Sequence, residues 1–162
     1  MKKEYIIPIF VPNLGCPNDC TFCNQRKISG QTTNVTAKDV KETIEYYLKN
    51  FKDDHKYVEV AFFGGSFTGI DKDVQIELLE AANEFIKAKK VNSIRISTRP
   101  DYIDKDILKM LKKYHVRTIE LGVQSSNNYI LDKSKRNHTF EDVVKASKMI
   151  RRRGFVLGHQ MM

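Results

Sequence analysis

Short apolar runs alternate with amphipathic patterns along the chain. Each apolar run is five to nine residues or so in length, which is typical of a buried strand. The runs predict five strands at residues 4–11, 57–63, 93–98, 117–123 and 155–162. Between them, apolar residues recur at helical spacing, as Val40, Ile44 and Leu48 do in the first interval. The pattern therefore predicts strands and helices in strict alternation.

Residues that cap helices stand at the boundaries of the helical patterns. Serine, threonine, aspartate and asparagine accept hydrogen bonds from the first backbone N–H groups of a helix. The predicted N-caps are Thr36, Asp71, Asp104 and Thr139. Gly154 comes just past the last helix, where a glycine commonly ends a helix. Four main helices are therefore expected.

Strict alternation of strands and helices predicts a parallel α/β sheet joined by right-handed crossovers. Two topologies fit, a doubly wound sheet and a partial barrel of the (β/α) type. In both, functional groups gather at the carboxyl ends of the strands. Polar or glycine-rich segments follow the first four strands: residues 12–30, 64–69, 98–101 and 124–128. We expect these segments to meet on one rim of the sheet.

Length and composition indicate one globular domain. The chain has 162 residues, of which 41% are hydrophobic and 30% charged. No apolar run reaches the roughly 20 residues that span a bilayer, and Glu4 and Pro8 interrupt the N-terminal apolar run, so a secretory signal is not expected. These features favour the cytoplasm and no membrane association. Because the last predicted strand has no covering helix, we expect residues 1–162 to be the N-terminal part of a longer (β/α) domain.

The net charge is +8, and basic residues concentrate in three segments, 111–117, 133–136 and 151–153. Such clusters are typical of proteins that meet an anionic partner such as RNA or a phosphorylated substrate. They also occur on solvated helix surfaces. The charge alone does not separate these interpretations.

All three cysteines lie within eight residues, at Cys16, Cys20 and Cys23. A structural zinc site needs a fourth ligand, and His159 is the histidine that the layout puts near the rim. A disulfide would leave one spare thiol, and a reducing compartment disfavours it. Thiolates also bind iron–sulfur clusters, and three of them leave one iron of a 4Fe–4S cluster open. The open iron favours the cluster interpretation, because catalytic metal sites keep such a position.

The spacing Cys-x3-Cys-x2-Cys, with Phe22 before the last cysteine and a predicted strand before the loop, resembles the radical S-adenosylmethionine (radical SAM) superfamily. The segment "FFGGSFTG" (62–69) is similar to that superfamily's Gly-Gly-Glu motif. The phrases "STRPDYI" (97–103) and "ELGVQS" (120–125) are similar to the branch that contains the Elongator catalytic subunit and oxygen-independent coproporphyrinogen dehydrogenase-like proteins. The resemblance covers nearly the whole chain.

The resemblance implies two cofactors, a 4Fe–4S cluster and S-adenosylmethionine. Cys16, Cys20 and Cys23 would hold the cluster, and the amine and carboxylate of S-adenosylmethionine would complete its open iron. Reductive cleavage would then give methionine and a 5′-deoxyadenosyl radical that abstracts hydrogen from a substrate. The cofactors carry this chemistry, and the protein supplies position and electrostatics.

Two rim segments would bind the cofactor by this resemblance. Phe22 would face the adenine. The carbonyls of Gly64 and Gly65 would accept hydrogen bonds from the cofactor ammonium group, because a backbone without Cβ can approach a ligand closely. Ser66 stands where the superfamily often has glutamate, so it would accept one hydrogen bond without adding charge.

Two further residues belong to the predicted cofactor site. Arg99 would pair with a carboxylate of the cofactor or substrate, and pairing with Asp101 is the structural alternative. Gln124 would bind the ribose hydroxyls, with capping of the following turn as its alternative. Glu120 shares a strand face with Gln124 and is a weaker candidate.

The resemblance implies an incomplete (β/α) barrel lined by parallel strands, and it implies the function of a radical SAM enzyme. A flavodoxin- or ferredoxin-type reductant would supply the electron. Resemblance to the Elongator branch implies a tRNA base as substrate, whereas resemblance to the coproporphyrinogen branch implies an acidic tetrapyrrole. The alternative function is a non-catalytic metal- or haem-binding protein on the same scaffold.

Overall fold

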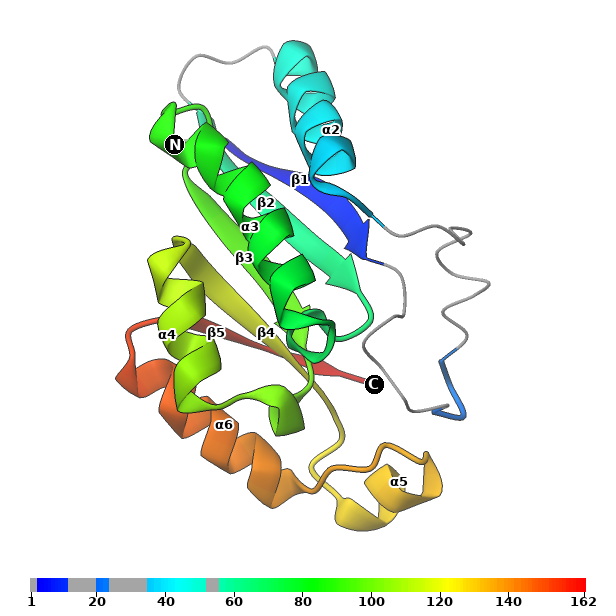
Figure 1. The fold of residues 1–162 in the computed structure, drawn as a ribbon. Helices are drawn as coiled ribbons and strands as arrows, with labels where there is room; N and C mark the ends of the chain where they lie inside the picture. Colours follow the sequence, from blue (N-terminus) through cyan, green and yellow to red (C-terminus); the bar gives the residue numbers. More distant parts are fainter. Residues whose placement is uncertain (1–2, 12–19, 24–34, 52–55) are drawn as a thin grey trace.

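The fold is a five-stranded parallel sheet with helices (Figure 1). The computed structural model describes residues 3–11, 20–23, 35–51 and 56–162, so Cys16 lies outside the described residues. The strands are β1 (Lys3–Val11), β2 (Lys56–Gly64), β3 (Ser93–Thr98), β4 (Val116–Gln124) and β5 (Val156–Met161). All five predicted strands are confirmed within one or two residues at most boundaries.

The strands lie in the sheet in chain order, β1-β2-β3-β4-β5, and every neighbouring pair is parallel. A doubly wound sheet reverses direction at a switch point, whereas a (β/α) barrel always steps the same way. The observed order therefore selects the partial barrel from the two predicted topologies.

The four longer helices begin where the cap pattern predicted, and a fifth, short helix is also present. They are α2 (Ala37–Asn50), α3 (Lys72–Lys87), α4 (Lys105–Lys113), α5 (Asn128–Lys133) and α6 (Phe140–Arg152), with short 3₁₀ turns η1 (Phe67–Gly69) and η2 (Pro100–Tyr102). Thr36 and Thr139 each form a capping box, in which the threonine hydroxyl and an aspartate three residues later satisfy each other's backbone N–H groups. Asp71 and Asp104 cap α3 and α4.

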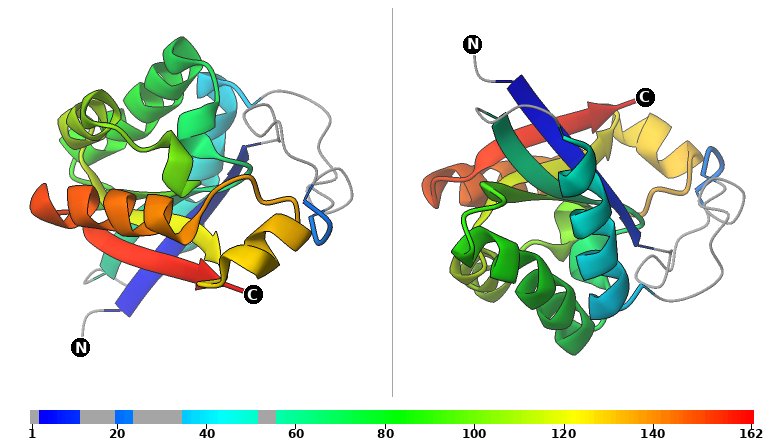
Figure 2. Two further views of the ribbon diagram at one scale, coloured as in Figure 1. Left: turned by 90° about the horizontal axis from the view of Figure 1, so that it is seen from below. Right: turned by 90° about the horizontal axis from the view of Figure 1, so that it is seen from above.

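The four longer helices, α2, α3, α4 and α6, cover one face of the sheet, and the opposite face carries no described helix (Figure 2). The hydrophobic core lies between the helices and the sheet. Alternate strand residues such as Ile7, Val60, Ile94 and Ile119 are completely buried there. The other alternate residues point to the helix-free face, which in a closed barrel would be the interior.

The helix α5 was not predicted, because residues 124–128 were interpreted only as a polar segment. Asn127 caps it, because its side-chain Oδ1 accepts a hydrogen bond from the Tyr129 N–H, and Leu131 anchors it in the interior. Six residues are too few to show a helical repeat, so the pattern gave no signal. Among the described residues, no helix combines the length and hydrophobicity that crossing a bilayer requires.

Candidate active site at the strand ends

The ends of β1 and β2 approach each other closely at the rim. Gly65 N–H donates to the carbonyl of Val11 at 3.4 Å. Gly64 has φ +117°, and a Cβ there would stand 2.2 Å from the Val11 oxygen. Glycine is therefore required at this position by the backbone itself. The predicted hydrogen bonds from the cofactor to the Gly64 and Gly65 carbonyls stay predictions.

The described part of the cysteine segment, residues 20–23, contacts the loop that follows α5 (Figure 1). Thr21 N–H donates to the Ser134 carbonyl at 3.2 Å, and the Cys20 thiol lies 3.6 Å from the Lys135 carbonyl. Cys20 is buried, and a tight turn closes with a 2.9 Å hydrogen bond from Cys23 N–H to the Cys20 carbonyl. Both thiols are free. Elements more than 100 residues apart in the chain thus meet at the thiol of Cys20.

Arg136 is the residue that sequence reasoning missed. Its side chain is 8% exposed, and its guanidinium donates to the Gly122 carbonyl at 2.7 Å while Nη1 lies 3.9 Å from Cys20 Sγ. Its Nε has no partner among the described residues. The sequence showed Arg136 only as part of a basic cluster, because the contact with Cys20 depends on the fold of α5.

Gly122 on β4 makes room for two polar side chains. A Cβ at Gly122 would lie 2.5 Å from a guanidinium nitrogen of Arg136 and 3.4 Å from Nε2 of Gln124. The Gln124 backbone has φ +67°, a conformation that non-glycine residues adopt rarely and often at functional sites. The structure therefore brings Gln124, Arg136 and Cys20 together at the end of β4.

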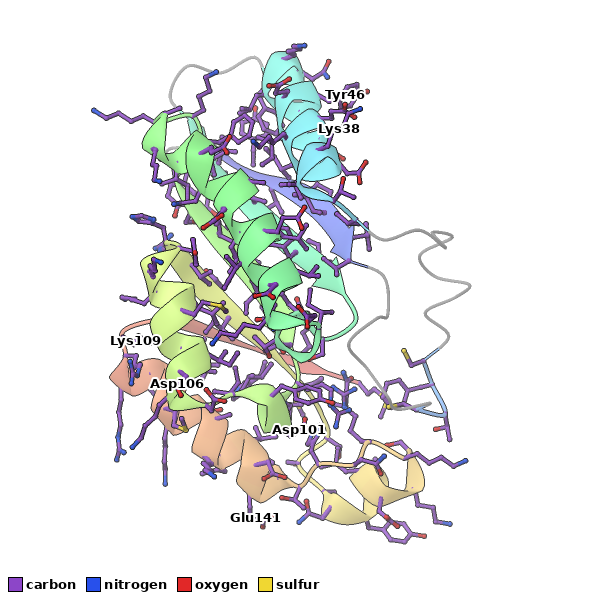
Figure 3. The ribbon with its side chains drawn as sticks, viewed as in Figure 1. Lys38, Tyr46, Asp101, Asp106, Lys109 and Glu141 are labelled. Carbon is purple, nitrogen blue, oxygen red and sulfur yellow. The ribbon has the colours of Figure 1, made fainter. Side chains whose placement is uncertain are left out.

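Arg99 is buried and fully engaged within the protein. Nε and Nη2 each donate to the Asp101 carboxylate at 2.9 Å, and Nη2 also donates to the Arg136 carbonyl at 2.8 Å. Asp101 lies on η2, beside the end of the sheet (Figure 3). The pair of Arg99 with Asp101, which was the structural alternative to cofactor binding, is therefore present. Arg99 fixes the backbone of Arg136, and its direct contact with a cofactor stays a prediction.

Ser66 is also held inside the protein. Its hydroxyl shares a 2.8 Å hydrogen bond with the Thr98 hydroxyl and accepts one from the Arg99 N–H at 3.2 Å. Thr98 in turn lies 2.5 Å from the Thr68 hydroxyl. This buried network joins the turn after β2 to the end of β3. Ser66 therefore positions the rim, and its predicted contact with the cofactor ammonium is not tested.

His138 is a second buried group that the sequence left unassigned. The side chain is 6% exposed, and neither ring nitrogen has a hydrogen-bond partner among the described residues. Burial, together with the positive charges of Arg136 and Arg99, lowers the pKa of His138 to about 4. The ring is therefore neutral near pH 7, and it lies close enough to Arg136, the arginine that contacts Cys20, to be affected by its charge.

The remaining predicted residues are placed as follows. Phe22 lies at the rim with 41% of its surface exposed. His159, the proposed fourth zinc ligand, has its Nε2 2.9 Å from the Ser147 hydroxyl of α6, so it is engaged on the helix-covered face.

The donor set fits an iron–sulfur cluster. Two reduced thiols lie at the rim of the partial barrel, and a guanidinium beside one of them can donate N–H···S hydrogen bonds of the kind that tune such clusters. Among the described residues no three metal-binding side chains form a group, and Cys16 is not one of those residues. Cys16 therefore stays a predicted ligand.

Comparison with known proteins identifies the family. The family model described as the Radical SAM superfamily matches residues 10–162. A tRNA uridine(34) acetyltransferase of Methanocaldococcus jannaschii is 32% identical over 65% of this chain and 23% of its own length. An oxygen-independent coproporphyrinogen-III oxidase-like protein of Bacillus subtilis is 29% identical over 95% of this chain and 32% of its own length.

Solved structures share the fold. The archaeal Elp3 of Methanocaldococcus infernus superposes with a TM-score of 0.67 at 23% identity, covering 100% of this chain and 38% of that one. The chain spans between 23% and 51% of the length of five curated relatives that it matches. Proteins of the matched superfamily bind a 4Fe–4S cluster and S-adenosylmethionine. The chain belongs to the radical SAM superfamily.

Proposed function

We propose that this chain forms the core of a radical SAM enzyme that cleaves S-adenosylmethionine reductively. Cys16, Cys20 and Cys23 hold the 4Fe–4S cluster and leave one iron for the cofactor. When bound, the cluster supplies the electron that breaks a sulfonium C–S bond and releases a 5′-deoxyadenosyl radical. The observation that carries the proposal is the meeting of Cys20, Arg136 and Gln124 at the end of β4.

Arg136 places a positive charge where the cofactor carboxylate would lie. Its Nη1 is 3.9 Å from the sulfur of Cys20, so an anion bound next to the cluster would come within reach of the same guanidinium. Arg99 holds the Arg136 carbonyl, which limits movement of the segment. Guanidinium groups bind carboxylates with two parallel hydrogen bonds, which adds orientation to attraction. Arg136 is therefore the proposed carboxylate partner.

The other rim residues complete the cofactor site. Gln124 presents an amide for the ribose hydroxyls, and exposed Phe22 presents a ring that can cover the adenine. The Gly64–Gly65 turn offers backbone carbonyls to the ammonium group. Ser66 and Thr98 keep that turn in place through their buried hydrogen bonds.

Two substrate classes are proposed from the relatives. A tRNA base is suggested by the similarity to a tRNA uridine(34) acetyltransferase, and an acidic tetrapyrrole by the similarity to a coproporphyrinogen-III oxidase-like protein. The proposed reductant is a flavodoxin- or ferredoxin-type protein, and the proposed compartment is the cytoplasm, where thiols stay reduced.

Electron paramagnetic resonance of the anaerobically reconstituted protein tests this proposal. A reduced 4Fe–4S cluster with one open iron changes its spectrum when S-adenosylmethionine binds. We expect that change in the wild type and its loss, with loss of iron, in Cys23→Ala. A spectrum that stays the same with saturating S-adenosylmethionine would favour the non-catalytic metal-binding alternative.

A further inference from the structure

The helix-free face of the sheet carries a cluster of three charged side chains that the cofactor site does not use. Glu59 on β2, Arg95 on β3 and Glu120 on β4 lie side by side across three strands. They alternate along their strands with the buried residues of the helix-covered face, so they point to the opposite side. This cluster would line the interior of the barrel.

Every member of the cluster is hydrogen-bonded. Arg95 Nε donates to Glu59 at 2.6 Å, and its Nη1 donates to Glu120 at 2.5 Å. Glu59 also accepts hydrogen bonds from Ser93 and Thr118, and Glu120 accepts them from Ser97 and Gln160. Burial alone lowers the pKa of Arg95, but the hydrogen bonds to both glutamates raise it above its ordinary value overall. The guanidinium therefore stays charged.

The cluster has one more carboxylate than it has guanidinium groups. The Glu59 side chain is 6% exposed and sits beside Arg95, whereas the side chain of Glu120 is 16% exposed. Burying charge is unfavourable unless the charge is paired. Arg95 pairs with both glutamates, so the cluster as a whole keeps one surplus negative charge, and Glu120 is the more accessible of the two carboxylates.

Glu120 also lies close to the proposed cofactor site. It is two residues before Gly122 on the same face of β4, so about 7 Å of strand separates it from the place where Arg136 and Gln124 meet. Gly158 on β5 leaves room for its side chain, because a Cβ there would be 3.1 Å from Glu120 Cγ. A molecule bound next to the cofactor would reach this carboxylate.

An apolar wall borders the cluster on the β1 and β2 side. Phe10 and Phe63 have their ring centroids 6.3 Å apart, and Ile6 and Phe10 are nearly half exposed. Arg117 also lies on the sheet, at the start of β4 and therefore at the end of the strand opposite the rim. Its guanidinium donates a hydrogen bond to the Tyr57 hydroxyl on β2. The helix-free face thus offers an apolar wall on β1 and β2 and, on the other side of β3, the partly exposed carboxylate of Glu120 on β4.

We infer that Glu120 is the specificity-determining residue of the substrate cavity and selects a flat heterocycle with a ring N–H, such as a nucleobase. Its carboxylate accepts the N–H, and the wall of Ile6, Phe10 and Phe63 packs against the ring. A polycarboxylate would meet a surplus negative charge at the same place. This inference rests on the proposed function and separates its two substrate classes.

Equilibrium binding of two probes tests this inference. Uridine has a ring N3–H, and N3-methyluridine replaces that hydrogen with a methyl group while keeping the ring. Saturation-transfer NMR would measure the dissociation constants of both, on full-length protein, before and after anaerobic reconstitution with S-adenosylmethionine. We expect uridine to bind about tenfold more tightly than N3-methyluridine, which corresponds to about 1.4 kcal/mol.

A variant pair makes the test specific to one side chain. Glu120→Met removes the acceptor and should bring the two dissociation constants together. Glu42→Met, at an exposed pair with Lys38 on α2 (Figure 3), should keep the tenfold difference. A ratio that survives in Glu120→Met overturns the inference. Equal binding of both probes by the wild type overturns it too, even if the variant does not fold.

Binding of the tetracarboxylate coproporphyrin III, measured by its fluorescence, tests the competing substrate class, the acidic tetrapyrroles. Tighter binding of this probe than of uridine by the wild type would overturn the inference. The outcome does not depend on the radical reaction. A protein with a cofactor-sensitive cluster but no N3–H discrimination would refute only the role of Glu120, and discrimination without a cluster would refute only the proposed function.

Discussion

Replacing Arg136 with alanine probes the link between α5 and the cysteine segment. The change removes the 2.7 Å hydrogen bond to the Gly122 carbonyl and the contact with Cys20 Sγ. The backbone contacts of residue 136 with Arg99 and Leu131 do not depend on the side chain, so the loop should persist. Hydrogen bonds to charged groups contribute about 1.5–3 kcal/mol each. The change also removes the proposed partner of the cofactor carboxylate. We therefore expect the dissociation constant of S-adenosylmethionine to rise about 10- to 100-fold.

The assay is equilibrium binding of S-adenosylmethionine to anaerobically reconstituted protein, with iron and sulfide content measured in the same samples. Arg136→Lys keeps the charge but not the two-pronged geometry, so its affinity should fall between those of the wild type and Arg136→Ala. Arg152→Ala, at an exposed position at the end of α6, is the matched control. The reasoning fails if Arg136→Ala retains the cluster and binds the cofactor within twofold of wild-type affinity.

Three further changes test the structure around the site. Thr98→Val removes the hydroxyl shared by Ser66 and Thr68 and should lower the free energy of unfolding by about 1–3 kcal/mol in urea denaturation. Thr98→Ser should restore most of it, and equal stability of all three proteins would contradict the role of the network. Gly64→Ala should destabilise by more than Gly154→Ala in the same assay, since both have positive φ but only the Gly64 Cβ would collide with backbone; equal losses would refute the steric argument. The unfolded state binds a proton on His138 near pH 6.5 whereas the folded state does so only near pH 4, so the free energy of unfolding should fall as the pH drops from 6.5 to 4 and then level off. His138→Phe should lose that part of the pH dependence, and an unchanged pH profile in this variant would be the contrary result.

Local patterns predicted the elements of this fold because they act within a few residues. Thr36 and Thr139 each stand three residues before an aspartate, and both form the capping box that this spacing favours. The short apolar runs likewise predicted the strands that contain Ile94 and Ile119, and both side chains are completely buried. The local patterns alone left two topologies, because they do not encode the order of strands in the sheet. That order confirms the partial barrel that the superfamily resemblance implied.

The candidate site was predicted only where its residues are close in sequence. The cysteine spacing was visible in the sequence. The contact of Cys20 with Arg136 was not, because Arg136 is 116 residues away and follows the unpredicted helix α5, which places it beside the thiol. Ser66 and Arg99 were assigned to the cofactor from their motifs, whereas the structure shows them engaged with Thr98 and Asp101. Contacts in the folded protein thus decide whether a polar side chain at the rim is available to a ligand or is held by other residues.

The central claim is that three cysteines leave one iron open for S-adenosylmethionine. Release of 5′-deoxyadenosine by the reconstituted protein, with dithionite as reductant, measures this most directly. We expect 5′-deoxyadenosine from the wild type, in amounts that depend on S-adenosylmethionine, and none from Cys20→Ala. A wild-type protein that carries zinc with four side-chain ligands, or that holds a cluster and yields no 5′-deoxyadenosine, would contradict it.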